Sequence, residues 1–371
     1  MSEFLSPYEM SKVLEGVIPA NKVARPNWLQ TAFGNVDTTN RSTVNFDREF
    51  QSNNTPAMYV APNVDAPIIK LQGFGTTELG FAYTKEGLAS PDYEEINGRQ
   101  LGQEFGQVDI WANWLGNIRK KLAVTEANFE TLFEVNAANL IFTATHTAQS
   151  ALHPTVLYDF NRTKITTAAD FAKGYVPEVD LTTLNSGGVG NLAWTANGTP
   201  YKDIITACNT VLRKGSIRAL VMAEDAYALL EADITANYKD AATLTLDITN
   251  RIALKVLPEV EKYQDLNYRR SLPIGSGRTV DIYTYTAIYH NRTTGVETMY
   301  VPEGHFAVLP SADNGIKRYG RIMHPGAQYE AMMRYLNTWE DPKTGTMESE
   351  IHINYLMGWR DSNQVAAWKV K

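Results

Sequence analysis

The chain has 371 residues, of which 44% are hydrophobic and 20% are charged, a balance typical of a globular protein with a sizeable core and not of a disordered chain. Its formal net charge of -7 disfavours a general attraction to nucleic acid phosphates or to anionic membranes. The single cysteine, Cys208, excludes an intrachain disulfide and any zinc site made of cysteine pairs, which suits folding in a reducing cytoplasm.

No stretch approaches the length of apolar sequence that crosses a membrane, and the N-terminus lacks the basic region and apolar run of a secretory signal. The sequence therefore predicts a soluble protein without a membrane span.

The first 40 residues are predicted to form an arm, with a short helix at 7–16 followed by an irregular polar segment that contains Pro19 and Pro26. From Val44 to about Tyr83 the pattern is that of strands interrupted by prolines, with few consecutive core positions. This pattern predicts a long β-hairpin that projects from the body of the protein and is placed to contact another molecule.

One long helix is predicted over residues 113–150, a stretch without proline, and at 1.5 Å per residue it would extend about 50 Å. One face of the helix is apolar and the other is polar and solvated. Because the flanking segments alternate Val, Ile, Thr and Tyr, we expect the apolar face to lie along a β-sheet. The apolar positions are Leu115, Ile118, Leu122, Phe129, Leu132, Phe133, Leu140 and Ala144, and the polar positions are Arg119, Lys120, Glu126, Glu130 and Glu134.

The following segments are predicted to include a compact α/β unit. Short strands at 157–160 and 165–166 precede a boundary rich in glycine and asparagine at 184–198. Thr199 and Pro200 mark the start of an amphipathic helix that ends near Gly215, followed by a buried strand at 217–222 and a second helix at 224–230. A meander of strands is expected over 279–310, and two closing strands, 350–356 and 365–370, are expected to pair with the sheet under the long helix.

The sequence predicts no catalytic, cofactor-binding or metal-binding residue. The glycine-rich segments 186–191 and 275–277 lack the pattern of a phosphate-binding loop and are interpreted as turns, and Cys208 fits the buried face of its helix. His352 alternates with isoleucines in a strand, which favours a solvated or hydrogen-bonded position. The histidines without metal-ligand spacing are His146, His153, His290, His305, His324 and His352, and the neighbouring carboxylates expected to be solvated are Asp92, Glu94, Glu95, Glu340 and Asp341.

The C-terminal region carries the most specific pattern of the chain. It contains Met-Tyr-Val-Pro-Glu-Gly-His at 299–305, Arg-Tyr-Gly at 318–320 and Tyr-Leu-Asn-Thr-Trp at 335–339, followed by Asp341, Pro342 and the closing strands. Tyr-Val-Ala-Pro at 59–62 and Tyr-Lys-Asp-Ile at 201–204 agree with it. In order and spacing these segments resemble the lambda-type major capsid protein E family of tailed phages, over residues 5–370 and least well over 123–167.

The resemblance implies an α+β, Hong Kong 97-like capsid fold. Its parts would be an N-terminal arm at 1–40, an extended E-loop at 41–83, a peripheral P domain at 84–170 and 316–371 that contains the long spine helix, and an axial A domain at 171–315. It implies a structural protein without enzymatic activity or cofactors, which assembles with further copies of itself into hexamers and pentamers of an icosahedral shell.

The same resemblance implies that the shell encloses double-stranded DNA without sequence-specific binding. Expected partners besides the chain itself are a portal and scaffold and decoration proteins, with no membrane partner. The expected location is the virion, after assembly in the host cytoplasm.

Two other functions stay open on the sequence. A phage-derived, encapsulin-like nanocompartment would have the same fold but enclose a protein cargo, and the nucleic acid content of purified particles distinguishes it from a capsid. A soluble enzyme that used the Gly/Asn segment as a binding loop would instead elute as a small oligomer.

Overall fold

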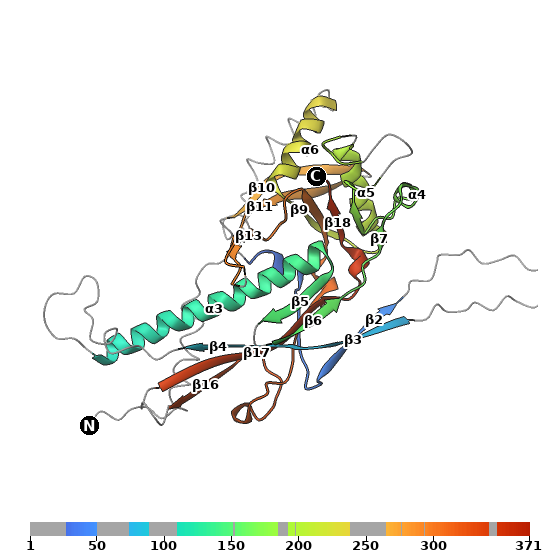
Figure 1. Cartoon of the computed structure of the whole chain (residues 1–371). Coiled ribbons are helices and arrows are strands. Elements are labelled where there is room, and N and C mark those ends of the chain that lie inside the picture. Colours follow the sequence, from blue (N-terminus) through green and yellow to red (C-terminus); the bar gives the residue numbers. More distant parts are fainter. Residues whose placement is uncertain are drawn as a thin grey trace, which may run out of the picture.

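The computed structural model describes residues 27–49, 74–88, 110–150, 153–184, 192–196, 198–237, 265–275, 277–292, 294–340 and 347–371. Two β-sheets and one long helix dominate these ranges, and the helix extends outward along the smaller sheet (Figure 1). The expected α+β class is confirmed. No helix in the described ranges combines the length and hydrophobicity needed to cross a bilayer.

The elements keep the labels of Figure 1. The helical elements are η2 (Leu29–Ala32), α3 (Ile110–Phe142), α4 (Ala168–Ala172), α5 (Pro200–Leu212), α6 (Glu224–Asn237), η3 (Ala312–Asn314), η4 (Pro325–Ala327) and η5 (Ser362–Gln364). The strands are β1 (Asn35–Thr38), β2 (Thr43–Glu49), β3 (Phe74–Gly80), β4 (Ala82–Leu88), β5 (Thr145–Ser150), β6 (His153–Asp159), β7 (Lys164–Ile165), β8 (Glu178–Asp180), β9 (Ile217–Met222), β10 (Leu266–Gly275), β11 (Arg278–Tyr285), β12 (Ile288–His290), β13 (Glu297–Met299), β14 (His305–Pro310), β15 (Gly315–Tyr319), β16 (Tyr335–Glu340), β17 (Met347–Trp359) and β18 (Ala366–Lys369).

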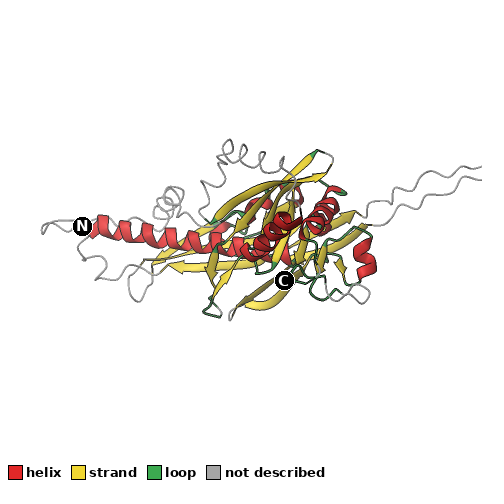
Figure 2. Ribbon diagram, turned by 90° about the horizontal axis from the view of Figure 1, so that it is seen from above, coloured by secondary structure: helices red, strands yellow, loops and turns green. Residues whose placement is uncertain are grey.

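Helix α3 is one continuous helix of 33 residues. Most of the predicted apolar face is buried, as the spacing of three and four residues requires for a helix that lies on a sheet. Viewed from above, its first turns extend beyond the strands and its last turns lie among them (Figure 2). The buried members of the face are Ile118, Leu122, Phe129, Phe133 and Leu140, whereas Leu132 is half-buried.

The helix ends at Phe142, and the prediction that it continues to residue 150 is wrong. Ala144 is buried but lies beyond the helix, with a φ of 53° in the left-handed region that an alanine rarely adopts. Strand β5 follows at once and pairs with β6, and the β-branched residues Thr145 and Thr147 suit such a strand. The backbone therefore reverses where the sequence pattern alone still permitted helix.

The sheet under α3 has five strands in the order β1-β15-β17-β16, with β4 paired to β17 as well. The long strand β17 pairs with β15 through its second half, with β16 through its first half and with β4 through its middle. The ring of Phe133 on α3 meets the ring of Tyr355 on β17 edge to face at 4.7 Å between centroids. The first predicted closing strand therefore does belong to the sheet under the helix.

The larger sheet has seven strands in the order β10-β11-β9-β14-β18-β8-β7. Strand β9 lies between β11 and β14, parallel to the first and antiparallel to the second, so the outer strands of the predicted meander over 279–310 are not neighbours. Its central turn is confirmed, because β12 and β13 pair antiparallel. The second closing strand, β18, pairs with β14 and β8 in this sheet and not in the sheet under the helix. Both corrections concern strand order, which is set by segments distant in the sequence.

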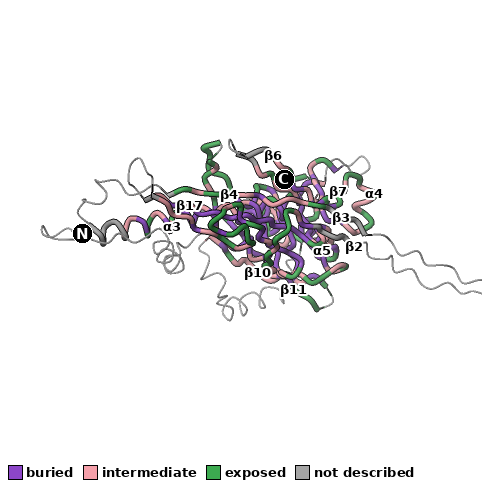
Figure 3. The backbone as a smooth tube through the Cα atoms, turned by 90° about the horizontal axis from the view of Figure 1, so that it is seen from below, coloured by how far each residue is buried: buried purple, intermediate pink, exposed green. Residues whose placement is uncertain are grey.

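Helix α5 confirms the local signals that predicted it: Thr199 is the N-cap residue and Pro200 opens the helix. On its apolar face Ile204, Cys208 and Val211 are fully buried, and Ile205 and Leu212 are half-buried. Strand β9 lies where it was expected, and helix α6 starts at Glu224 as expected but continues beyond residue 230 to Asn237. Buried residues concentrate in the middle of the molecule, where the two sheets and the inner part of α3 meet (Figure 3).

Strands β2 and β3 form an antiparallel hairpin whose register runs from Thr43↔Gly80 to Glu49↔Phe74. The base of the predicted hairpin is therefore confirmed, whereas residues 50–73 lie outside the described ranges, as does the predicted helix at 7–16. Strand β1 pairs in parallel with β15, so the last part of the predicted arm is an edge strand of the five-stranded sheet.

Candidate functional site

Glu134 on α3 is fully buried and accepts three hydrogen bonds. Its Oε1 accepts from the backbone N–H of Leu29 and from the hydroxyl of Tyr285, both at 2.8 Å, and its Oε2 accepts from the backbone N–H of Gln30 at 2.9 Å. Leu29 and Gln30 open the short helix η2, where N–H groups have no partner within the helix. The side chain thus caps η2 from outside.

Burial raises the pKa of Glu134 to about 7, while the N–H groups of Gln30 and Leu29 and the hydroxyl of Tyr285 act to lower it. The interpretation of Glu134 as a solvated residue on the polar face is wrong. Its partners lie 104 to 151 positions away in the sequence, so helical spacing could not show them. One signal was available: no charged residue follows Glu134 before the helix ends at Phe142, which indicates that this last part of α3 is less exposed to solvent than the part before it.

The side chain of Gln30 continues this contact from α3 to the five-stranded sheet. Its Nε2 donates to Glu130 Oε2 at 2.6 Å, and its Oε1 accepts from the Lys317 ammonium on β15 at 3.0 Å. Lys317 lies 4.5 Å from the centroid of the Phe133 ring, a cation–π distance, and burial lowers the pKa of this lysine. Gln30 therefore links the segment before β1 to both the helix and the sheet.

Trp28 fixes the same segment against the seven-stranded sheet. Its ring packs on Tyr283 at 5.3 Å and on Tyr285 at 6.2 Å between centroids. The guanidinium of Arg218 on β9 lies 5.9 Å from the Trp28 ring and donates to the hydroxyl of Thr31 at 2.8 Å. Residues 28–31 are thus part of the core and join both sheets to α3.

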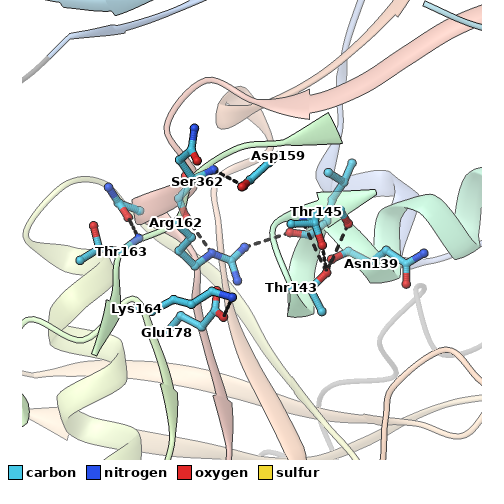
Figure 4. A network of polar contacts seen from close by, with 12 residues as sticks. Asn139, Thr143, Thr145, Asp159, Arg162, Thr163, Lys164, Glu178 and Ser362 are labelled. Atoms are coloured by element: carbon cyan, nitrogen blue, oxygen red, sulfur yellow. Dashed lines mark hydrogen bonds and ion pairs between the residues drawn. The ribbon is translucent and has the colours of Figure 1, made fainter. Parts of the chain in front are cut away.

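The C-terminal end of α3 has a second buried charge, Arg162, which lies between β6 and β7 (Figure 4). Its guanidinium donates to the carbonyl oxygens of Ile141 at 2.7 Å, Leu140 at 2.9 Å and Ser362 at 3.1 Å. The last carbonyl groups of a helix lack partners and lie at the negative end of its dipole. A guanidinium at this place donates hydrogen bonds to these oxygens and also offsets their partial negative charge. Burial lowers the pKa of Arg162 to about 10, and the charge of Glu178 opposes that shift.

His352 on β17 is buried, with 3% of its surface exposed, and so the solvated alternative is wrong and the hydrogen-bonded one is confirmed. Its Nε2 lies 2.8 Å from Glu350 Oε1 and its Nδ1 lies 2.5 Å from the hydroxyl of Tyr83. Burial lowers the pKa of His352, whereas Glu350 raises it. Both ring nitrogens are engaged, which leaves neither free to act as a base or a metal ligand.

The other chemically notable positions do not form a site. Burial raises the pKa of the Cys208 thiol to about 12, so the nucleophilic thiolate is not formed near neutral pH. Gly275 and Gly277 have positive φ in the turn between β10 and β11, as a turn there requires. Within the described ranges no three His, Cys, Asp or Glu side chains form a group able to hold a metal ion.

Several sequence-based expectations fall outside what the structure describes. They concern the turn at 186–191, the carboxylates Asp92, Glu94, Glu95 and Asp341, and the side chain of Glu340.

No family model matches the sequence, and no curated protein matches it. Among solved structures, the proposed capsid protein of a prophage from Escherichia coli CFT073 superposes with a TM-score of 0.61 at 15% identity, over 97% of this chain and 99% of that one. A phage-related protein from Bordetella bronchiseptica RB50 gives 0.47 at 14% identity over 96% of each chain. The mature capsid of bacteriophage PhiM1 gives 0.44 at 12% identity over 94% and 87%.

The likeness to the E. coli prophage protein spans nearly the whole of both chains, although few residues are identical. At that identity it establishes the architecture, and function has to be argued separately. The sequence-based expectation of a phage capsid fold is thereby confirmed: the chain has the Hong Kong 97-like capsid fold.

Proposed function

We propose that this chain is the major capsid protein of a tailed double-stranded DNA phage and assembles into the hexamers and pentamers of an icosahedral shell around the genome. The observation that carries the proposal is the superposition on the E. coli prophage capsid protein over 97% of this chain and 99% of that one.

The hairpin β2–β3 supports assembly as the function. Within the described ranges its two strands pair only with each other, and they extend to one side of the large sheets (Figure 1). A two-stranded hairpin alone is marginally stable in water. It gains stability when it lies on a neighbouring copy, and such contacts repeated by symmetry close a shell. This supports assigning residues 41–83 to an E-loop.

The other domain boundaries that we propose follow the two large sheets. We assign residues 1–40 to the arm, 84–170 and 316–371 to a P domain built on α3 and the five-stranded sheet, and 171–315 to an A domain built on most of the seven-stranded sheet. Strands β7 and β18 come from the two P-domain segments yet pair within the seven-stranded sheet. The two domains therefore share this sheet, and we expect them to move as one body.

The polar groups that the structure buries serve to connect elements, which supports a structural role without catalysis or cofactor. The net charge of -7 suits a wall that encloses DNA without binding it tightly or by sequence. Further partners in this proposal are a portal and scaffold and decoration proteins. The protein would reside in the virion after assembly in the host cytoplasm.

The test is to express the chain alone and examine it by gel filtration, sedimentation and negative-stain microscopy. Hexamers, pentamers or closed shells are expected, and a strict monomer over a wide concentration range would contradict the proposal. Particles recovered from phage-producing cells should contain DNA. Particles with a protein cargo and no nucleic acid would instead identify a nanocompartment.

A further inference from the structure

The loop at 320–334, between β15 and β16, exposes three large apolar side chains close together in the sequence. Met323 is 61% exposed, Tyr329 is 49% exposed and Met333 is 55% exposed. Isolated exposed apolar residues are ordinary on a protein surface, but three on one short loop are not. This concentration raises the question of what the loop contacts.

The loop is held in one conformation by hydrogen bonds within its backbone and by one to the side chain of Asn40. Ile322 N–H donates to the Glu330 carbonyl at 3.0 Å, Arg321 and Ala331 form an isolated β-bridge, and Ala331 N–H donates to Asn40 Oδ1 at 2.7 Å. Ile322 is fully buried. One part of the loop thus packs inward, while the three large apolar side chains remain in solvent.

His324 attaches the loop to the sheet. Its ring lies 5.2 Å from the ring of Tyr335 and 5.4 Å from that of His352, and its Nδ1 accepts from Gly326 N–H at 3.1 Å. Side chains alternate between the two faces of a strand, so His352 lies on the face of β17 opposite to that of Tyr355, which packs against α3. The loop therefore projects from the side of the sheet that α3 leaves uncovered (Figure 1).

The conformation of the loop tip costs energy. Gln328 and Tyr329 both have positive φ, at 52° and 57°. Residues with side chains seldom adopt this region, because the Cβ atom then lies too close to the following carbonyl oxygen. In this conformation Tyr329 leaves about half of its surface in solvent. Strain that exposes an apolar group is typical of a surface that binds something.

The charges on the loop indicate what it binds. Arg334 of the loop is paired with Glu126 on α3 at 2.8 Å, whereas Arg321 and Glu330 are both exposed, carry opposite signs and form no ion pair with a described residue. A surface that carries apolar side chains together with one cation and one anion is complementary to a second copy of itself. A nucleic acid partner would be repelled by Glu330, and a uniformly charged protein partner would match only one of the two charges.

We propose that loop 320–334 is a contact between copies of this chain, in which Met323, Tyr329 and Met333 pack against the same loop of a second copy while Arg321 of one copy pairs with Glu330 of the next. Methionine side chains suit such a contact because they adapt to slightly different neighbours. The inference rests on the proposed shell and adds to it a named surface and partner.

The first test replaces the apolar group. Met323→Ser combined with Met333→Ser should raise the protein concentration needed for assembly by about tenfold or more, measured by light scattering and microscopy. The matched controls are Val124→Ser and Leu157→Ser, which are 53% and 60% exposed and lie on α3 and β6. They should assemble at the same protein concentration as the unmodified chain. An equal rise of that concentration in all variants would overturn the proposal.

The second test identifies the partner. Arg321→Glu and Glu330→Arg, each alone, place like charges in contact and should reduce assembly, and the two together should restore it to within about twofold of the unmodified chain. Restoration by the double change requires that the two positions face each other. Failure to restore, or full assembly of both single variants, would overturn the proposal.

The two proposals fail differently. If the unmodified chain forms no shells, the proposed function is wrong and the loop contact falls with it. If every variant forms shells like the unmodified chain, only the loop contact is wrong.

Discussion

The hydroxyl of Tyr285 donates a hydrogen bond of 2.8 Å to the carboxylate of Glu134, and both side chains are buried. Glu134 belongs to α3 and Tyr285 to β11, so this bond joins the long helix to the seven-stranded sheet. The same carboxylate accepts from the N–H groups of Leu29 and Gln30. Helix, sheet and N-terminal segment thus meet at one acidic group, and its removal should weaken the connection among all three.

Glu134→Ala should lower the free energy of unfolding of the unassembled chain by about 3 to 5 kcal/mol, because three buried donors lose their acceptor and a cavity remains. The measurement is urea denaturation at pH 8, where the carboxylate is ionised. Lys120→Ala, at an exposed position of the same helix, is the control and should change stability by less than about 0.5 kcal/mol. Equal effects of the two changes would show that Glu134 does not hold these elements together.

His146 should make the unassembled chain less stable in acid. Its ring stacks on Tyr158 at 5.4 Å, its Nδ1 has no hydrogen-bond partner in the described part of the chain, and burial lowers the pKa of His146 to about 4. Between pH 6.5 and 4 the unfolded chain therefore binds a proton that the folded chain does not. Stability should fall as the pH falls through this range, by up to about 1.4 kcal/mol per pH unit.

His146→Phe removes this proton uptake and should flatten the dependence of unfolding free energy on pH in this range. The raised pKa of Glu134 contributes a slope of the opposite sign, and it does so in both proteins. The difference between the two slopes therefore reports the contribution of His146 alone. Val124→Phe, at an exposed position of α3 without a titratable group, should leave the slope as it is. Identical slopes for the unmodified and the His146→Phe chains would refute the assignment.

Arg162→Lys should destabilise the chain by about 2 to 4 kcal/mol even though the charge is kept. A single ammonium group cannot reproduce the fork of N–H donors that reaches Leu140, Ile141 and Ser362. Soluble yield and urea denaturation report the loss. Arg119→Lys, exposed on α3, serves as the matched change and should be nearly neutral. A tolerated lysine at position 162 would mean that the helix end needs only a positive charge.

Elements specified by neighbouring residues were predictable from the sequence. Helix α5 is an example: Thr199 and Pro200 set its start, and apolar residues at helical spacing, such as Ile204 and Cys208, set its buried face. The apolar face of α3 was found in the same way. These signals act within a few turns, so no distant partner was needed to recognise them.

The features that could not be predicted from the sequence depend on partners that are distant in the sequence. The end of α3 is fixed by the left-handed backbone at Ala144 and by Arg162, whose three acceptors come from two distant segments. Glu134 looked solvated because its donors lie in residues 29–30 and in β11. The pairing of the outer strands of the meander was mispredicted for the same reason, since β9 enters between β11 and β14 from an earlier part of the chain.

The hairpin β2–β3 allows fold and assembly to be separated. Replacing residues 47–76 by Asn-Gly keeps the pair Phe46↔Thr77 and joins the strands through a tight turn. We expect the shortened chain to unfold with a free energy within about 1 kcal/mol of the unmodified chain, because the removed strand residues pair only with each other. Sedimentation and microscopy should then show subunits without closed shells.

A longer deletion provides the contrast. Replacing residues 47–84 by the same turn also removes Ala82, Tyr83 and Thr84, which begin β4 and pair with β17 in the five-stranded sheet. Ala82 is buried, and the Tyr83 hydroxyl bonds to His352, so this change should cost about 2 kcal/mol or more and reduce soluble yield. Closed shells from the shorter deletion would show that the hairpin is not an assembly element. Unfolding of the shorter deletion would show instead that the hairpin is part of the subunit core.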